Sequence, residues 1–313
     1  MTLNPQTTAF IFPGQGSQAT GMGRDLAAQF ESARLVFEES SQILGFDLSK
    51  IMWDGPETEL NDTLNTQPAL FIHSLAVYRA FESLGLGFSP VILAGHSLGE
   101  LSAICAAGGI PFADGLRLVR KRGELMKRAG ELNPGGMAAI LGLEIPTLEK
   151  VCAEASTGGE IVQVANDNSP GQVVISGHKP ALERAIAGAK AAGARRAMPL
   201  AVSIAAHSPL MDTIQAEWNA AVAGSAFSDA KVPVMGNVHA ALIQSAAELR
   251  ADVIAQMQSR VRWVDSVREM SKNGVTAYVE VGSGTVLGGL IKRIDAQAEN
   301  HPLGNPVDFN ILK

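Results

Sequence analysis

A serine stands at the centre of the segment Gly95-His96-Ser97-Leu98-Gly99, which follows an apolar stretch and precedes a helix-permissive one. The G-x-S-x-G pattern in a strand–turn–helix context is typical of a nucleophile on a tight, strained turn, where small flanking residues leave its hydroxyl uncrowded. The N-terminus of the following helix offers free N–H groups to a developing oxyanion. We therefore predict that Ser97 is a nucleophile.

A serine nucleophile needs a general base, and the chain contains six histidines. His96 neighbours Ser97 on the turn and is expected to point elsewhere. His207 stands where an inserted segment returns to the main sheet, and clefts form at such junctions. His301, near the end of the chain, matches the late histidine of an α/β-hydrolase triad. The residues alone rank His207 and His301 close together.

The segment 117–128 (RLVRKRGELMKR) holds six basic residues and one acidic residue. On a helix, Arg122 stands three or four residues from every member of an apolar stripe, formed by Leu118, Val119, Leu125 and Met126. A guanidinium on an inward face is costly unless it meets an anion. That anion is either a structural carboxylate or a substrate carboxylate held by two parallel hydrogen bonds, and the pattern does not decide between them.

A glycine-rich segment at 14–19 (GQGSQA) matches the G-x-G-x-x-A fingerprint of dinucleotide-binding folds. The fingerprint requires a second strand that ends in an acidic residue about 20 positions later. The corresponding segment here, FESARLVFEESSQIL, has a helical pattern instead. The sequence therefore argues against a dinucleotide site.

The composition limits the classes of partner. The 313 residues include 25 basic and 31 acidic side chains, and the net charge of −6 argues against general nucleic-acid binding. The two cysteines, Cys105 and Cys152, fit neither a disulfide framework nor a zinc site. The N-terminus lacks a signal-peptide pattern, and no run approaches the roughly 18 apolar residues of a membrane span. We expect a cytoplasmic protein whose partners are small molecules or proteins.

Alternating apolar segments and turns predict an α/β fold with an insert. Segments 8–12 and 91–94 are predicted as buried strands, with a long helical stretch over 22–44 and another helix after Gln67-Pro68. Between 137 and 202 the order of elements is β-α-β-β-α-β, which is the ferredoxin-like unit. We predict a hydrolase-like core of 1–130 and 204–313, with a mainly parallel sheet, and a ferredoxin-like inserted subdomain at 131–203.

Several motifs occur in the order found in one enzyme family. They are FIFPGQGSQ near the start, TQPAL at 66–70, GHSLGE at 95–100, RKRGELM around Arg122, NSPGQVVISG at 168–177, HSPLM at 207–211 and YVEVGSGTVLGGLIKRI near the end. Through them the chain resembles the malonyl-CoA:acyl carrier protein transacylases of bacterial fatty acid synthesis over nearly its whole length. The resemblance implies transfer of malonyl from malonyl-CoA to the phosphopantetheine thiol of holo-acyl carrier protein, with no cofactor and no metal.

The resemblance also implies catalytic roles. Ser97 would form the acyl-serine intermediate, and His207, not His301, would act as the base and later as the acid. In the family a backbone carbonyl orients the histidine in place of an aspartate. The matching position in this chain is Gln256.

Substrate-binding roles follow from the same resemblance. The backbone N–H groups of Gln15 and Leu98 would form the oxyanion hole, and Arg122 would bind the free carboxylate of the malonyl group. Ala206, which precedes the histidine, departs from the proline, serine or aromatic residues common in the family. Its small size leaves room for an α-substituent, so selectivity against methylmalonyl is an open question.

Other functions share parts of this pattern. The same scaffold serves trans-acting polyketide acyltransferases, malonate decarboxylase transacylase subunits and proofreading acyl hydrolases, although Arg122 argues against a hydrolase of uncharged acyl chains. An α/β-hydrolase that uses Ser97 with His301 is a further alternative, and a non-catalytic carrier-protein docking module is the alternative of another class. We expect a monomer. Its acidic carrier protein would meet a basic surface, either the outward face of 117–128 or Lys190, Arg195 and Arg196.

Overall fold

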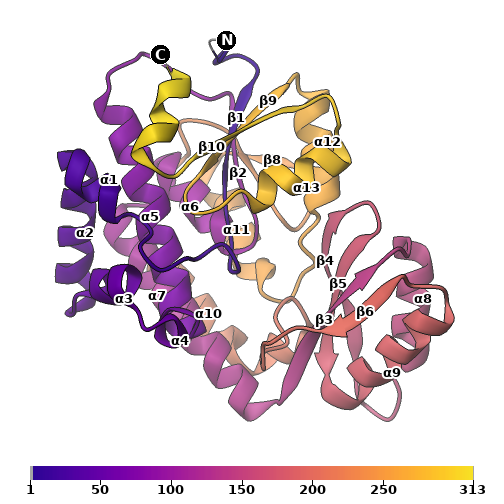
Figure 1. Cartoon of the computed structure of the whole chain (residues 1–313). Helices are drawn as coiled ribbons and strands as arrows, with labels where there is room; N and C mark the ends of the chain where they lie inside the picture. Colours follow the sequence, from indigo (N-terminus) through magenta and orange to yellow (C-terminus); the bar gives the residue numbers. More distant parts are fainter. Residues whose placement is uncertain (1–2, 313) are drawn as a thin grey trace.

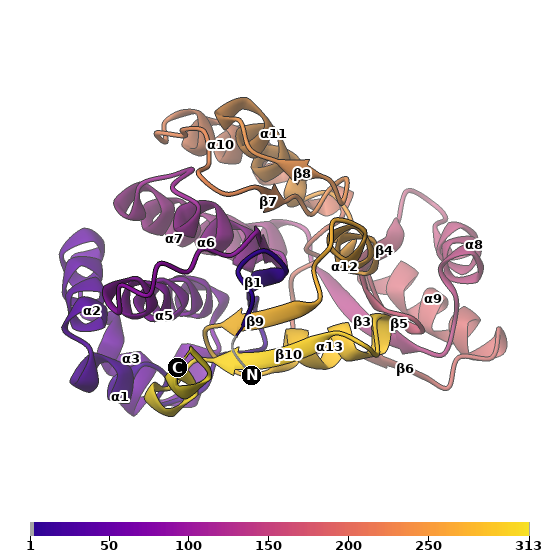
Figure 2. The same ribbon diagram turned by 90° about the horizontal axis from the view of Figure 1, so that it is seen from above.

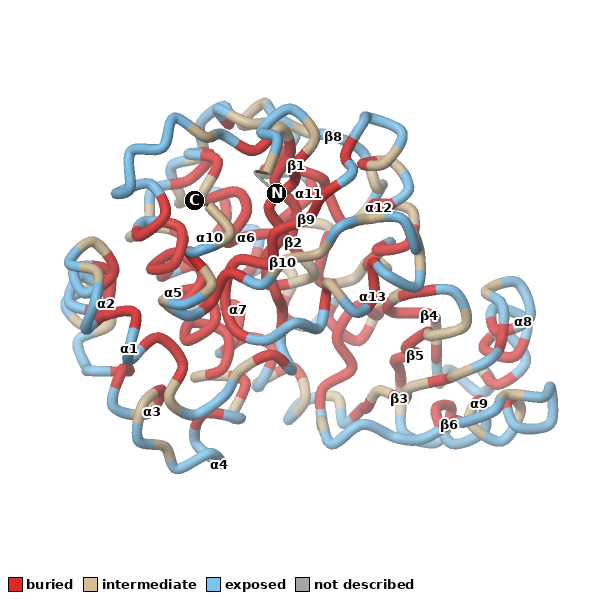
Figure 3. The backbone as a smooth tube through the Cα atoms, turned by 45° about the horizontal axis from the view of Figure 1, so that its top comes forward, coloured by how far each residue is buried: buried red, intermediate tan, exposed pale blue. Residues whose placement is uncertain are grey.

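The larger of two sheets forms the centre of the molecule in the computed structural model, which describes residues 3–312 (Figure 1). Its strand order is β10-β9-β1-β2-β7-β8, and all neighbours are parallel except β7 and β8. The strands are β1 (Thr8–Phe12), β2 (Ile92–Gly95), β7 (Val234–Met235), β8 (Leu242–Ile243), β9 (Ala277–Val281) and β10 (Glu299–Leu303). The central strands β1 and β2 are buried along their whole length (Figure 3). Their carboxyl ends therefore form a rigid edge for the loops that follow them.

Helices cover both faces of this sheet (Figure 2). Alternate residues of β1 enter two separate apolar clusters, with Phe10 and Phe12 on one face and Ala9 and Ile11 on the other. The helices are α1 (Arg24–Gln29), α2 (Glu31–Leu44), α3 (Leu48–Asp54), α4 (Glu57–Leu60), α5 (Thr63–Ser83), α6 (Leu98–Ala106), α7 (Phe112–Leu132), α10 (Asp212–Ala223), α11 (Ala246–Gln256), α12 (Trp263–Lys272) and α13 (Val286–Ile294), with 3-10 helices η1 (Pro209–Met211) and η2 (Pro306–Leu312). No helix within residues 3–312 is both long and apolar enough to cross a membrane.

The smaller sheet forms a lobe beside the core (Figure 1). Its antiparallel strands have the order β4-β5-β3-β6. They are β3 (Gly135–Leu141), β4 (Val162–Ser169), β5 (Gln172–His178) and β6 (Arg196–Pro199), and α8 (Ile145–Ala155) and α9 (Lys179–Ala191) pack on one face in a separate apolar cluster. This is the ferredoxin-like arrangement that was predicted. All of these elements lie inside 131–203, although the exact bounds of the subdomain stay a prediction.

Two backbone hydrogen bonds attach the lobe to the core. The N–H of Asp167 in β4 donates to the carbonyl of Val261 at 2.9 Å, and the N–H of Val261 donates to the carbonyl of Ala165 at 2.8 Å. The sheet face that α8 and α9 leave uncovered is thereby held opposite the carboxyl edge of the larger sheet.

The predicted helical stretch over 22–44 is two helices. Phe30 separates α1 from α2 with an extended backbone, at φ −119° and ψ 115°. Its ring packs against Phe309 of η2, with the centroids 4.7 Å apart. A long-range aromatic contact of this kind leaves no signal in the local helical pattern.

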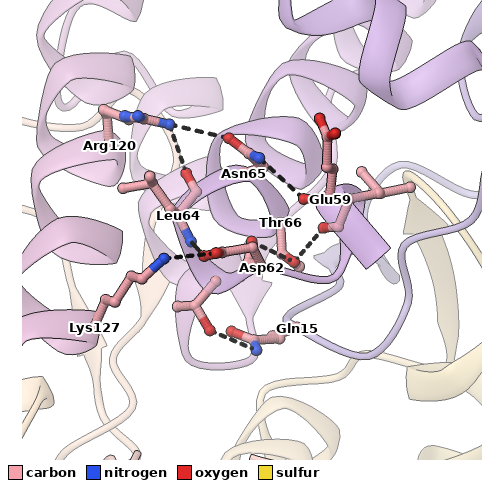
Figure 4. Close-up of polar contacts among 10 residues, drawn as sticks. Gln15, Glu59, Asp62, Leu64, Asn65, Thr66, Arg120 and Lys127 are labelled. Atoms are coloured by element: carbon pink, nitrogen blue, oxygen red, sulfur yellow. Dashed lines mark hydrogen bonds and ion pairs between the residues drawn. The ribbon is translucent and has the colours of Figure 1, made fainter. Parts of the chain in front are cut away.

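The helix predicted after Pro68 begins earlier, at Thr63, so that the proline lies inside α5. A proline at 68 cannot donate to the carbonyl of Leu64, four residues before it. Arg120 of α7 replaces that donor, since its Nη1 lies 2.9 Å from the Leu64 carbonyl oxygen (Figure 4). The helix therefore tolerates its proline because a neighbouring helix satisfies the freed carbonyl.

Candidate active site

Ser97 lies at the turn between β2 and α6, at the carboxyl edge of the larger sheet. Its φ of 52° and ψ of −109° are rare for a residue with a side chain, and nucleophile turns require such a conformation. A Cβ on Gly95 would lie 2.0 Å from backbone atoms of Gly99, and a Cβ on Gly99 would lie 2.0 Å from the carbonyl oxygen of Phe12. Only glycine fits at either position, so the sharp turn that the pattern predicts is present.

His207 reaches Ser97 from the segment that follows β6, and its Nε2 lies 2.8 Å from the serine Oγ. On the other side of the ring, Nδ1 donates to the backbone carbonyls of Gln256 at 2.9 Å and Ser259 at 3.0 Å. Because Nδ1 carries the proton in this arrangement, Nε2 is free to accept one. Gln256 thus contacts the histidine through its backbone carbonyl, which is the contact that the family resemblance implies.

The environment of His207 favours its neutral form. Burial, followed by the nearby charge of Arg122, lowers its pKa to about 3, and the two carbonyl acceptors oppose this shift only in part. The imidazole is therefore uncharged at neutral pH, which is the state that a general base needs.

The other candidate histidines do not contact the serine. Nε2 of His96 lies 2.8 Å from Oδ1 of Asn168, so this ring is engaged elsewhere, as expected. His301 lies in β10, where its Nε2 is 3.6 Å from the carboxylate of Glu299, and it lines a different cavity. Only His207 of these three is within hydrogen-bond distance of the Ser97 hydroxyl.

Arg122 extends from α7 into the same site and is 1% exposed. Its Nη2 donates to the Oγ of Ser97 at 3.1 Å and to Oε1 of Gln256 at 2.9 Å. Its Nη1 donates to Oε1 of Gln67 at 3.0 Å. The sequence identified the buried arginine, whereas it gave no role to Gln67, which lies within the TQPAL motif.

The guanidinium of Arg122 has no ion-pair partner among residues 3–312, although other arginines of α7 are paired. Its Nε makes no hydrogen bond within the same part of the chain. Burial lowers the pKa of Arg122 only to about 10, so the group keeps its charge at neutral pH. The helical pattern requires an anion near Arg122, and no carboxylate of residues 3–312 lies within ion-pair distance of its guanidinium. The guanidinium is therefore available to an anionic ligand.

Asn237, which follows β7, stabilises the turn at Ser97 through two hydrogen bonds. Its Oδ1 accepts a hydrogen bond from the N–H of Ser97 at 2.8 Å, and its Nδ2 donates to the carbonyl of Gly95 at 2.7 Å. The two bonds fix the backbone on both sides of His96. Asn237 was not predicted, because an asparagine after a two-residue strand has no distinguishing local pattern.

Two buried carboxyl groups complete this support. The N–H of Asn237 donates to Oε1 of Glu100 at 2.9 Å and to Oδ2 of Asp252 at 3.2 Å. Nε2 of Gln256 donates to Glu100 and, at 2.9 Å, to the carbonyl of Ser97. Burial raises the pKa of both acids, and the charge of Asp252 raises that of Glu100 further. We therefore assign Glu100 as protonated. It is the glutamate of the GHSLGE motif, for which no role was predicted.

A cavity of about 340 Å³ opens beside Ser97, between the two sheets. The core contributes Gln15 and Leu98 to its lining, and the uncovered face of the smaller sheet contributes Met137, Ala139 and Val174. Ala206 lines the same cavity next to His207. The position of the cavity agrees with the cleft expected between core and insert.

The N–H groups of Gln15 and Leu98 donate to no carbonyl within the described chain. Leu98 is in the first turn of α6, where helices leave such donors free. A Cβ on Gly14 would lie 2.5 Å from the carbonyl oxygen of His96, so the loop that carries Gln15 packs directly on the serine turn. Nε2 of Gln15 also donates to Oγ1 of Thr63 at 3.2 Å, which holds the loop against α5 (Figure 4).

The chain is similar to known proteins over nearly its whole length. Residues 9–302 match the family model of the acyl transferase domain. A malonyl CoA-acyl carrier protein transacylase of Escherichia coli K12 is 46% identical over 298 residues, which cover 94% of this chain and 96% of that protein. The crystal structure of an acyl carrier protein S-malonyltransferase from Vibrio cholerae has a TM-score of 0.95 and 43% identity, with 98% of this chain and 100% of that one covered. A type II PKS acyl-carrier protein in complex with its malonyl-transacylase gives a TM-score of 0.93 and 42% identity, covering 97% and 98%.

Proposed function

The chain belongs to the acyl transferase family, and on that premise we propose that it transfers malonyl from malonyl-CoA to the phosphopantetheine thiol of acyl carrier protein, which supplies fatty acid synthesis. One observation carries the substrate assignment. The charged, buried guanidinium of Arg122 lies 3.1 Å from the Oγ of Ser97 and lacks an ion-pair partner within residues 3–312. An acyl group that ends in a carboxylate can form an ion pair with this guanidinium, and an uncharged acyl group cannot.

The first half-reaction makes the acyl-enzyme. Arg122 binds the malonyl carboxylate and so places the thioester carbonyl carbon at the Oγ of Ser97. As Oγ bonds to that carbon, its proton passes to Nε2 of His207. The carbon–sulfur bond then breaks, and the CoA thiolate leaves with the proton that His207 returns.

The second half-reaction runs the same steps with a different thiol. The pantetheine thiol of the carrier protein gives its proton to Nε2 of His207 and attacks the malonyl-serine carbonyl. The bond from carbon to Oγ breaks, and Ser97 recovers its proton from His207. Each tetrahedral oxyanion would receive the N–H groups of Gln15 and Leu98, and such a donor contributes about 10²–10³ in rate.

The pairing of basic side chains favours one of the two candidate docking surfaces for an acidic carrier protein. On the outward face of 117–128 the basic side chains are already paired, for example Lys127 with Asp62 at 2.7 Å. The cations Lys190, Arg195 and Arg196 are exposed and form no ion pair within residues 3–312. The strand that contains Arg196 ends at Pro199, and the segment that follows it contributes Leu200 and Val202 to the lining of the cavity. We therefore place the carrier protein at this second group of cations.

The remaining attributes follow from the proposed chemistry. One chain supplies every group that the reaction uses, which supports a monomer. Proton transfer and acyl transfer need neither metal nor redox cofactor. Malonyl-CoA and carrier protein as substrates support a cytoplasmic location.

Mass spectrometry of the intact protein after mixing with malonyl-CoA tests the acyl-enzyme. We expect one malonyl group on Ser97, none on Ser97→Ala, and discharge when holo-acyl carrier protein is added. His207→Ala should lose transfer, whereas His301→Ala, the matched control, should retain it. Equal labelling of Ser97→Ala would exclude this mechanism, and a greater loss in His301→Ala would favour an α/β-hydrolase triad. Malonyl-CoA hydrolysis without transfer to carrier protein would exclude the proposed function.

A further inference from the structure

Arg122 forms hydrogen bonds only with neutral groups of residues 3–312. Its guanidinium donates to the amide oxygens of Gln67 and Gln256, to the hydroxyl of Ser97 and, at 3.4 Å, to the sulfur of Met126. These acceptors supply partial charges and no full negative charge. A buried cation with such a shell keeps most of its electrostatic effect on the groups around it.

The nearest acid does not act as the counter-ion. Glu100 lies on the far side of the Gln256 amide, which donates to Glu100 and accepts from Arg122. Glu100 also shares its surroundings with Asp252, since the N–H of Asn237 donates to both. Two adjacent buried carboxyl groups cannot both ionise readily, so burial and the neighbouring Asp252 raise the pKa of Glu100 well above its usual range. Glu100 is also outside ion-pair distance of the guanidinium, so Arg122 has no direct counter-ion until a ligand arrives.

This cation lies close to the base. Nη2 of Arg122 and Nε2 of His207 both contact the Oγ of Ser97, at 3.1 Å and 2.8 Å. When His207 takes the serine proton, its imidazolium becomes a second positive charge, which is separated from the guanidinium of Arg122 only by the Oγ of Ser97. The other groups that face the imidazole are His96, whose pKa burial lowers so that it is neutral, and the carbonyls of Gln256 and Ser259. After burial, the charge of Arg122 is thus the main factor that opposes protonation of His207.

We propose that the malonyl carboxylate activates the catalytic base: by neutralising Arg122, it permits His207 to accept the proton of Ser97. This inference rests on the proposed function and adds a second reason for malonyl selectivity. An acetyl group lacks the carboxylate, so it meets a serine whose base is still suppressed. Selectivity then appears in the rate of acylation and not only in binding. Charges at this separation change proton affinity by roughly 10- to 100-fold.

Formate tests the proposal because acetyl plus formate together supply the groups of malonyl. The measurement is the single-turnover rate of Ser97 acetylation by acetyl-CoA in the wild-type protein. We expect formate to raise this rate by about 10- to 100-fold with saturation, and formamide, its uncharged control, to have no such effect. Absence of activation up to formate concentrations that inhibit malonyl transfer, or up to molar formate where no inhibition occurs, would overturn the proposal.

Arg122→Met provides the second measurement. Removal of the cation should raise the acetylation rate without formate, and formate should then have no effect. A merely structural arginine would leave acetylation unchanged or slower in this variant, which would contradict the proposal. The two hypotheses fail separately, because malonyl transfer to carrier protein tests the function. Normal malonyl transfer with formate-insensitive acetylation would leave the function standing and remove only the base-activation step.

Discussion

Arg122→Met should separate the functional role of the buried arginine from its role in stability. Methionine has similar length, and Met126 already packs against the guanidinium. Loss of the cation leaves the malonyl carboxylate unpaired in a buried site, which costs about 3–5 kcal/mol. The kcat/KM for malonyl-CoA should therefore fall by about 10²- to 10⁴-fold. Acetyl transfer should not fall, so that the preference between the two substrates changes by at least the same factor.

The same substitution should change the stability of the protein only slightly. A salt-bridged arginine would leave its carboxylate partner unpaired, at a cost of about 3–5 kcal/mol. Arg122 has no such partner within residues 3–312, and desolvation of its charge is unfavourable throughout. Its loss removes that cost but leaves the amide oxygens of Gln67 and Gln256 without a donor, at about 1–3 kcal/mol each. The two effects are of similar size, so we expect the unfolding free energy to change by no more than about 2 kcal/mol in either direction.

The assay combines urea unfolding with transfer to holo-acyl carrier protein from both CoA thioesters. Arg120→Met on the same helix is the matched control, because Arg120 lies outside the cavity and satisfies the carbonyl of Leu64. It should keep malonyl transfer and lose about 1–3 kcal/mol of stability. The reasoning is refuted if Arg122→Met unfolds more readily than Arg120→Met, or if both thioesters lose activity equally.

Two further predictions concern the scaffold. Gly99→Ala should lower the free energy of unfolding by at least about 3 kcal/mol, because the added Cβ would collide with the carbonyl oxygen of Phe12. Gly289→Ala is the control, since it lies in a helix and its Cβ would meet nothing within 4 Å. Urea unfolding should show it to be neutral or slightly stabilising. Burial lowers the pKa of His73 in the folded protein to about 4, whereas an unfolded histidine has a pKa of about 6.5. The unfolding free energy should therefore decrease as the pH falls below 6.5, by roughly 2 kcal/mol at pH 5. His73→Leu should show a shallower decline, and an unchanged pH dependence would contradict this account.

The parts of the site that were predictable are those encoded within a few residues. The turn at Ser97 depends on glycines two positions away on each side, and the inward position of Arg122 follows from its helical spacing. The choice between His207 and His301 did not follow from local pattern. The family resemblance supplied it, and the 2.8 Å contact agrees with that choice.

The support beneath the site was not predictable from the sequence. Asn237 bonds to backbone groups about 140 positions earlier in the chain, and Gln256 reaches Glu100 across a separation of 156. These pairs form because parallel strands place their carboxyl ends at one edge. The order of strands in the sheet decides which loops meet there, and a single sequence does not display that order.

The scaffold must hold several unfavourable features at one point. Ser97 and His207 both have positive φ, at 52° and 57°, and each such conformation costs on the order of 1 kcal/mol or more. Arg122 adds a desolvated charge beside them. These costs are supportable where β1 and β2 are fully buried and cannot shift to relax the turn. In the proposed mechanism the malonyl carboxylate would remove one of these costs on binding to Arg122, so its binding energy would be released next to the atoms that react. An acyl group without a carboxylate cannot gain that energy, whatever its fit to the cavity.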